Sequence, residues 1–145
     1  MTFLGNLPAD DEIVSFCKPI ELEKRTMGIR YGNDIWVKFG TEFSYLAAEV
    51  QAQTYAFRYA DRSTVCVPEV YHRFQRGDRA YILTEYIEGE SPKQYLDNNP
   101  SQTERWDDAV FETIRILWEI PVPDNARPGP IGGDAERSSM GGIFL

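Results

Sequence analysis

The sequence is poor in basic side chains. Lys and Arg number 15 against 23 Asp and Glu, which gives a formal net charge of −8. Binding to a phosphate backbone needs clustered basic groups, so this composition argues against a nucleic-acid partner and against an anionic membrane surface. No apolar run approaches the ~20 residues of a transmembrane helix, and the N-terminus lacks the regions of a secretory signal. We therefore expect a cytoplasmic protein with no membrane partner.

Cysteine and histidine are scarce as well. Cys17 and Cys66 are the only cysteines, and we interpret them as reduced thiols, with a single disulfide as the alternative. His72 is the only histidine, and it is expected to be structural or exposed. No group of His, Cys and Asp residues has metal-ligand spacing, so no metal site is predicted.

The composition is that of a globular protein. Of the 145 residues, 42% are hydrophobic and 13% aromatic, which predicts a single domain over residues 1–145. The expected fold class is α+β, with an antiparallel sheet of about five strands packed by a long helix, then a carboxy-terminal helix and tail. Apolar periodicity predicts helices at 10–17, 41–59, 92–96 and 101–120, and strands at 27–31, 35–39, 65–74 and 80–87. Pro68 interrupts the third of these strands, which is therefore expected to start late or to lie at an edge.

The last predicted helix carries two further expectations. Ser101 followed by Glu104 has the spacing of a capping box, which would begin the helix. Six residues are expected to form the buried stripe of this helix: Trp106, Ala109, Val110, Thr113, Leu117 and Ile120. Residues 121–145 form a tail rich in Pro and Gly, which is expected to fold over an exposed cleft as one way of covering it.

A lysine interrupts the apolar run IWVKFG. Strand alternation places Trp36 and Lys38 on one face, and Glu49 follows on the next predicted helix. The two charges form either an ion pair in a cleft, able to bind an anion or to act as an acid–base pair, or a structural link between helix and sheet. The residues alone leave this choice open. Trp36 is expected to be a core residue, with a pocket wall or a side chain covered by the tail as the alternatives.

Five stretches together resemble a known family. WVKFG, AAEVQAQTYAFRYA, VCVPEVYHRF, YILTEYIEGES and the late IPVP…PGPIGG look like the amino-terminal lobe of the protein-kinase-like superfamily, in its aminoglycoside phosphotransferase (choline-kinase-like) branch common in fungi. The resemblance implies a kinase-like small lobe in which Lys38 is the strand lysine and Glu49 its helix partner. It also implies that Glu85, Tyr86 and Ile87 occupy the hinge, where an adenine edge binds backbone groups.

The sequence departs from that family at the catalytic motifs. The 145 residues contain no H-x-D catalytic loop with a later metal-binding aspartate and no G-x-G-x-x-G loop. Phosphoryl transfer depends on positioning the nucleophile and neutralising charge, so phosphotransferase activity is not expected of this chain alone. No cofactor is expected, and residual ATP binding is the one exception considered.

Three functions are compatible with this pattern. In the first, the lobe is a repurposed pocket that binds a small organic molecule in fungal specialised metabolism. Its candidate reaction is isomerisation or cyclisation, with Lys38, Glu49 or a nearby Tyr as acid or base. In the second, it is a pseudokinase-type regulatory module that forms a homodimer over the exposed cleft or docks a full-length relative. In the third, it is a truncated remnant without a selected function.

Overall fold

A computed structural model describes residues 6–20, 26–41 and 43–122. The tail proposed to cover the cleft lies outside these ranges, apart from its first two residues. Within them, no helix is both long and apolar enough to cross a membrane. The elements run in the order α1 (Asp10–Cys17), β1 (Thr26–Tyr31), β2 (Ile35–Gly40), α2 (Phe43–Tyr59), β3 (Val70–Arg76), β4 (Arg79–Glu85), α3 (Pro92–Asn98), the 3₁₀ turn η1 (Pro100–Gln102) and α4 (Thr103–Trp118).

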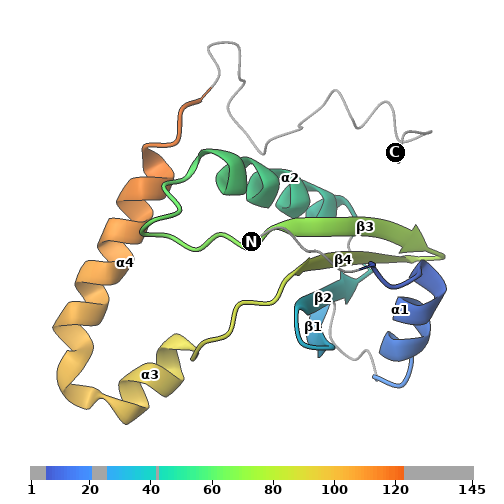
Figure 1. Ribbon diagram of the computed structural model, residues 1–145, viewed down its shortest axis with the longest axis horizontal. Coiled ribbons are helices and arrows are strands. Elements are labelled where there is room, and N and C mark those ends of the chain that lie inside the picture. Colours follow the sequence, from blue (N-terminus) through green and yellow to red (C-terminus); the bar gives the residue numbers. More distant parts are fainter. Residues whose placement is uncertain (1–5, 21–25, 42, 123–145) are drawn as a thin grey trace.

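The fold is α+β around an antiparallel sheet, as the periodicity predicts. The described residues form four strands in the order β1-β2-β4-β3, where about five were expected (Figure 1). β3 begins at Val70 instead of residue 65 and lies at an edge of the sheet. Pro68 explains the late start, because a proline has no N–H to donate to a strand ladder.

Both hairpins turn at a glycine. Gly32, between β1 and β2, and Gly77, between β3 and β4, each have a φ of +60°. This left-handed conformation is accessible to glycine without the steric cost that a Cβ would bring. The first turn is further held by Arg30, whose guanidinium donates to the carbonyl oxygens of Gly32 and Asn33.

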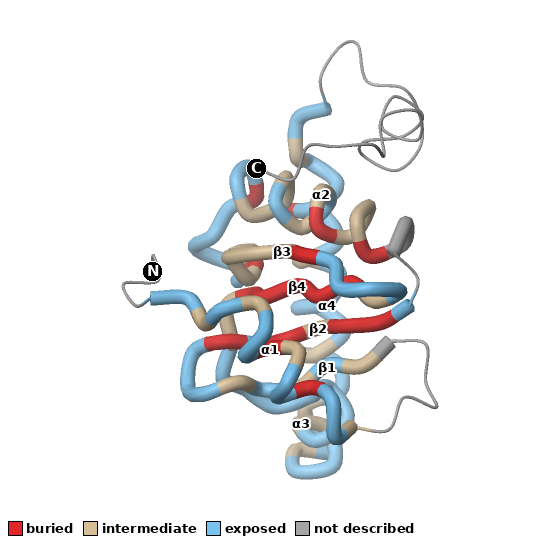
Figure 2. Tube along the Cα trace, turned by 90° about the vertical axis from the view of Figure 1, so that its right-hand side faces the viewer, coloured by how far each residue is buried: buried red, intermediate tan, exposed pale blue. Residues whose placement is uncertain are grey.

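The sheet is covered on both faces. α1 packs on one face, where Ile13, Val37 and Leu83 are fully buried. α2 packs on the other face, where Leu46 and Val50 contact β4. Figure 1 shows the two helices on opposite sides of the sheet, and Figure 2 shows that the buried residues concentrate on β2 and β4. One helix was expected to pack on the sheet, whereas two helices do so in the described part of the chain.

The helices α3 and α4 form an arm beside this body (Figure 1). The arm meets the body near the carboxyl end of α4, where Ile116 packs with Ala60 and Val67. Of α4, which lies wholly within the described ranges, only Ile116 is buried. The predicted buried stripe is therefore wrong, because Val110 and Leu117, two of its members, are exposed.

The predicted capping box is also misplaced. Ser101 lies inside η1, and α4 begins after Gln102, which makes no side-chain cap. The capping box is formed instead at the start of α3. There the Gln94 N–H donates to Ser91 Oγ, and the Ser91 N–H donates to Gln94 Oε1 at 2.9 Å. Both sites have the required spacing, but η1 already holds Ser101 in a turn that is not the start of α4.

Candidate functional site

An ion pair joins the sheet to α2. Lys38 Nζ on β2 lies 2.6 Å from Glu49 Oε1 and 2.5 Å from Glu49 Oε2 on α2. The two side chains are 29% and 31% exposed, so the pair is only partly shielded from water. Because an ammonium has three N–H donors, Glu49 accepts two of them and the third is the donor that a ligand anion would use.

The pair lies in the wall of a cavity of about 370 Å³. This volume is within the ~300–1,000 Å³ typical of sites for small organic molecules. The lining combines this one ion pair with apolar and neutral polar side chains. The described lining residues are Met27, Gly28, Trp36, Lys38, Glu49, Gln53, Pro68, Ile82 and Thr84.

Strand register explains why these residues meet. Lys38 stands opposite Gly28 on β1 and Ile82 on β4. Side chains directly opposite one another in an antiparallel sheet project from the same face, so β1, β2 and β4 each contribute to the pocket. Trp36 and Thr84 are paired in the same way. The pocket is therefore built on the sheet face that α2 covers only in part.

Several residues that line the pocket were not predicted from the sequence, although its spacing carries a signal for Ile82, Thr84 and Gln53. Ile82 and Thr84 alternate along their strand just as Trp36 and Lys38 do, and only the register was needed to bring the two sets together. Gln53 lies four residues after Glu49, one helical turn along the same face of α2. Its amide donates to the Pro68 carbonyl oxygen at 2.9 Å, which ties α2 to the segment before β3.

Trp36 forms a wall of the pocket and is 37% exposed. Its ring stacks on Tyr86 with a centroid separation of 6.2 Å and an interplanar angle of 29°. The Arg30 guanidinium in turn lies 4.1 Å from the centre of the Tyr86 ring. On the other side, the indole lies against Gly28, where an added Cβ would be only 2.4 Å from a ring carbon. The favoured core interpretation of Trp36 is therefore wrong, and the side chain is a wall of the pocket.

The three residues expected at a hinge lie at the end of β4 and directly after it, and they do not line the described pocket. The Glu85 carboxylate accepts a hydrogen bond from the Glu69 N–H at 3.2 Å. The Tyr86 N–H donates to the Asp34 carbonyl oxygen at 2.9 Å, so this backbone donor is already used within the fold. Ile87 is exposed. None of the three is among the described residues that line the pocket, and only Tyr86 approaches it, through its stack on Trp36.

The only histidine lies outside this site. His72 Nε2 is 2.9 Å from Asp10 Oδ1, and the two residues connect β3 to α1. Arg76 adds to this contact through a hydrogen bond of 3.0 Å to Asp11. The structural interpretation of His72 agrees with this placement. Among the described residues, no three His, Cys, Asp or Glu side chains are grouped so that they could hold a metal ion.

The chemistry of the pocket is therefore a charged pair at one end and an aromatic wall beside it. Comparison of the chain with protein-family models gives no match, and comparison with curated proteins gives none either. Any functional conclusion consequently depends on the geometry of the site itself.

Proposed function

We propose that this chain binds a small organic molecule that carries an anionic group, in the pocket formed by Lys38, Glu49 and Trp36. The observation that carries the proposal is the position of the ion pair in the wall of a 370 Å³ cavity. A pair that served only to link helix and sheet would have no need of an adjoining cavity. The Lys38 ammonium would hold the anionic group, while Trp36 and Ile82 contact the apolar part of the ligand.

We also propose that the scaffold is a kinase-like small lobe. Two strands, a helix and two further strands follow one another, with Lys38 on the second strand and Glu49 on the helix. This order supports the proposal. The ligand we propose is nevertheless not a nucleotide. The Glu85 and Tyr86 N–H groups already donate to the Glu69 and Asp34 carbonyl oxygens, so two of the three expected hinge donors are occupied within the fold.

Acid–base conversion of the bound molecule is a second candidate function. Lys38 and Glu49 place a proton donor and a proton acceptor in the same pocket. Isomerisation requires a proton to leave one position of the substrate and another to be returned elsewhere, and positioned acid and base groups are sufficient for this. Glu49 would accept the proton and Lys38 would supply one, with no metal or nucleotide taking part.

A thermal-shift titration tests ligand binding. The probes are benzoate, indole-3-carboxylate, inorganic phosphate, and ATP with and without Mg²⁺. A ligand at ~100 times its dissociation constant stabilises the native state by ~2.7 kcal/mol. We expect an aromatic carboxylate to raise the melting temperature of the wild type by several degrees and to have no effect on Lys38→Met.

The matched control removes a lysine that is remote from the pocket. Lys93 forms an exposed ion pair with Asp97 on α3, so Lys93→Met changes the net charge equally without touching the site. This variant should respond as the wild type does. An equal shift in all three proteins would contradict the proposal, and so would a Mg²⁺-dependent response to ATP alone, which would indicate that nucleotide binding survives.

A further inference from the structure

A stripe of large apolar side chains is exposed on α4. It consists of Val110, Phe111, Ile114, Leu117 and Trp118, which we call the α4 stripe. The spacing i, i+1, i+4, i+7, i+8 places all five on one side of a helix. Trp118 is 87% exposed, Phe111 72%, Ile114 53%, Leu117 41% and Val110 37%. Scattered exposed apolar residues are normal, but a contiguous set on one element marks an interaction surface.

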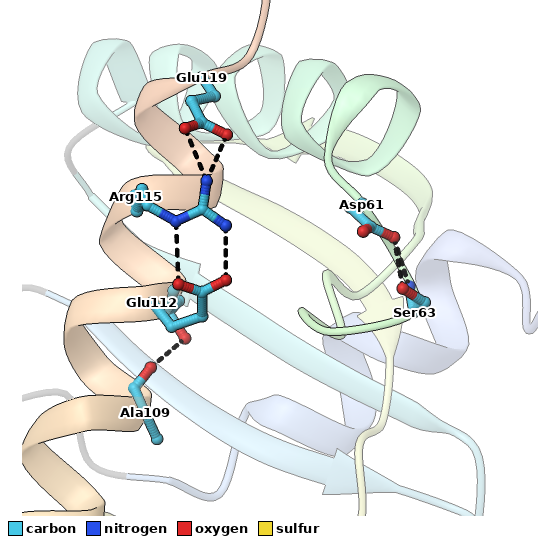
Figure 3. A network of polar contacts seen from close by, with 7 residues as sticks. Asp61, Ser63, Ala109, Glu112, Arg115 and Glu119 are labelled. Atoms are coloured by element: carbon cyan, nitrogen blue, oxygen red, sulfur yellow. Dashed lines mark hydrogen bonds and ion pairs between the residues drawn. The ribbon is translucent and has the colours of Figure 1, made fainter.

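Other residues of α4 make contacts within the chain. Ile116 anchors the helix to Ala60 and Val67. On the polar side, Arg115 bridges Glu112 and Glu119 with hydrogen bonds of 2.6 to 2.9 Å (Figure 3). The hydrogen bond from Arg115 lowers the pKa of Glu112, so this carboxylate stays charged to lower pH. The α4 stripe is the part of the helix that lacks a covering element among the described residues.

The stripe is symmetric about Ile114. In an antiparallel contact centred there, Val110 would face Trp118 of a second copy and Phe111 would face Leu117. A small side chain thus opposes the largest one at each end, which is the large-against-small pairing that fills an interface well. The two antiparallel helix dipoles also oppose each other favourably. A two-fold contact requires this kind of self-complementary patch, because the same surface is used by both subunits.

The exposed apolar area of the α4 stripe reaches the size of a biological interface only when the stripes of two chains are counted together. Taking ~150–250 Å² for a fully exposed aromatic side chain, the stripe offers ~500 Å². A symmetric contact would then bury ~1,000 Å² in total, which is the lower limit for a biological interface. We propose that the α4 stripe is the contact surface of an antiparallel homodimer of this chain. The stripe shares no residue with the Lys38 pocket, so the two proposals stand or fall separately.

Sedimentation velocity at low-micromolar and high-micromolar concentrations tests this dimer. The wild type should change from monomer to dimer across this range, because an interface of the smallest biological size gives modest affinity. Phe111→Glu combined with Trp118→Glu should remain monomeric at both concentrations. Arg105→Gln is the control, since Arg105 lies on the side of α4 opposite the stripe, and this variant should dimerise as the wild type does.

The melting temperature of each variant is measured in parallel at the low concentration. Both replaced aromatic side chains are exposed in the monomer, so the double variant should melt close to the wild type. A wild type that is monomeric at both concentrations would overturn the proposal, whether the stripe is then left bare or is covered by residues 123–145. Dimerisation of the double variant to the same extent as the wild type would overturn it too, as would growth of the wild type beyond a dimer.

Discussion

The body of the molecule and its α3–α4 arm bury apolar side chains to different extents. In the body, α1 and α2 each pack on one face of the sheet, and the side chains of Ile13, Leu46 and Leu83 are almost completely buried. In the arm, α4 has a well-segregated apolar side, yet its largest members, Phe111 and Trp118, are exposed. Both regions have the sequence pattern of helices that pack.

The difference shows what periodicity does and does not specify. An apolar stripe at helical spacing determines that a helix will have a side suited to burial. It does not determine what covers that side, because the covering surface comes from segments far away in the chain or from another molecule. The body supplies such a surface for α2. Among the described residues it covers α4 near the carboxyl end, at Ile116, while Trp106 near the amino end packs on Tyr95 of α3.

The largest expected effect compares two leucines in these regions. Leu83→Ala should destabilise the protein by ~3 kcal/mol, because it removes a fully buried side chain and leaves a cavity. Leu117→Ala should cost less than ~1 kcal/mol in the monomer, because that side chain is already partly in water. Urea unfolding at low-micromolar concentration measures both. Similar losses for the two variants would mean that the arm is packed as firmly as the body.

A smaller effect is expected from the buried thiol of α1. Burial raises the pKa of Cys17 from 9.0 to about 11. The unfolded chain therefore loses this proton first as pH rises. The contribution of the Cys17 thiol to the free energy of unfolding is complete below about pH 9. It declines as the pH rises through about 11, by ~2 kcal/mol in total. The free energy of unfolding at several pH values in this window measures the decline.

Cys17→Ala provides the control for this alkaline effect. Burial also raises the pKa values of Tyr71 and Tyr81, so some decline should persist in the variant. It should be clearly shallower than in the wild type. The rate of alkylation is a second test, because the exposed Cys66 thiol should react faster than the buried Cys17 thiol. Equal alkaline slopes in the two proteins, or equally fast alkylation of both thiols, would contradict the assignment.

The smallest effect compares two glycines, one in the sheet and one in the segment that leads to the arm. Gly28→Ala should push the Trp36 indole out of place and cost ~1 kcal/mol, since a partly exposed ring can move away. Gly89→Ala meets no atom within 4 Å of the new Cβ and should be neutral. Tryptophan fluorescence and urea unfolding measure the two effects. An unchanged emission spectrum in Gly28→Ala would show that the position of the Trp36 indole does not depend on the absence of a side chain at residue 28.

Much of the body was predictable because it is encoded locally. The alternation in IWVKFG placed Trp36 and Lys38 on one face, and the structure has them together in one pocket wall. The helix 10–17 was predicted with its observed bounds. Pro68 indicated that its strand would start late or lie at an edge, and both are true.

The errors have a common physical origin. Ser101 and Ser91 both precede residues suited to a capping box, and only the path of the chain through η1 decided between them. The partners of Lys38 in the pocket, such as Ile82 and Thr84, were hidden because they depend on the register of two strands that are distant in sequence. Neither choice can be made from the spacing of neighbouring residues.

Local sequence patterns thus encode the α+β class, the hairpins, the long helix α2 and the shared face of Trp36 and Lys38. All of these follow from the preferences of residues within a few positions of one another. It is the tertiary fold that places the expected Lys38–Glu49 pair beside a cavity, joins the Glu85 carboxylate to the Glu69 backbone and leaves the α4 stripe exposed. Those outcomes depend on which distant surfaces the folded chain brings together, because burial is a property of pairs of surfaces and not of one segment.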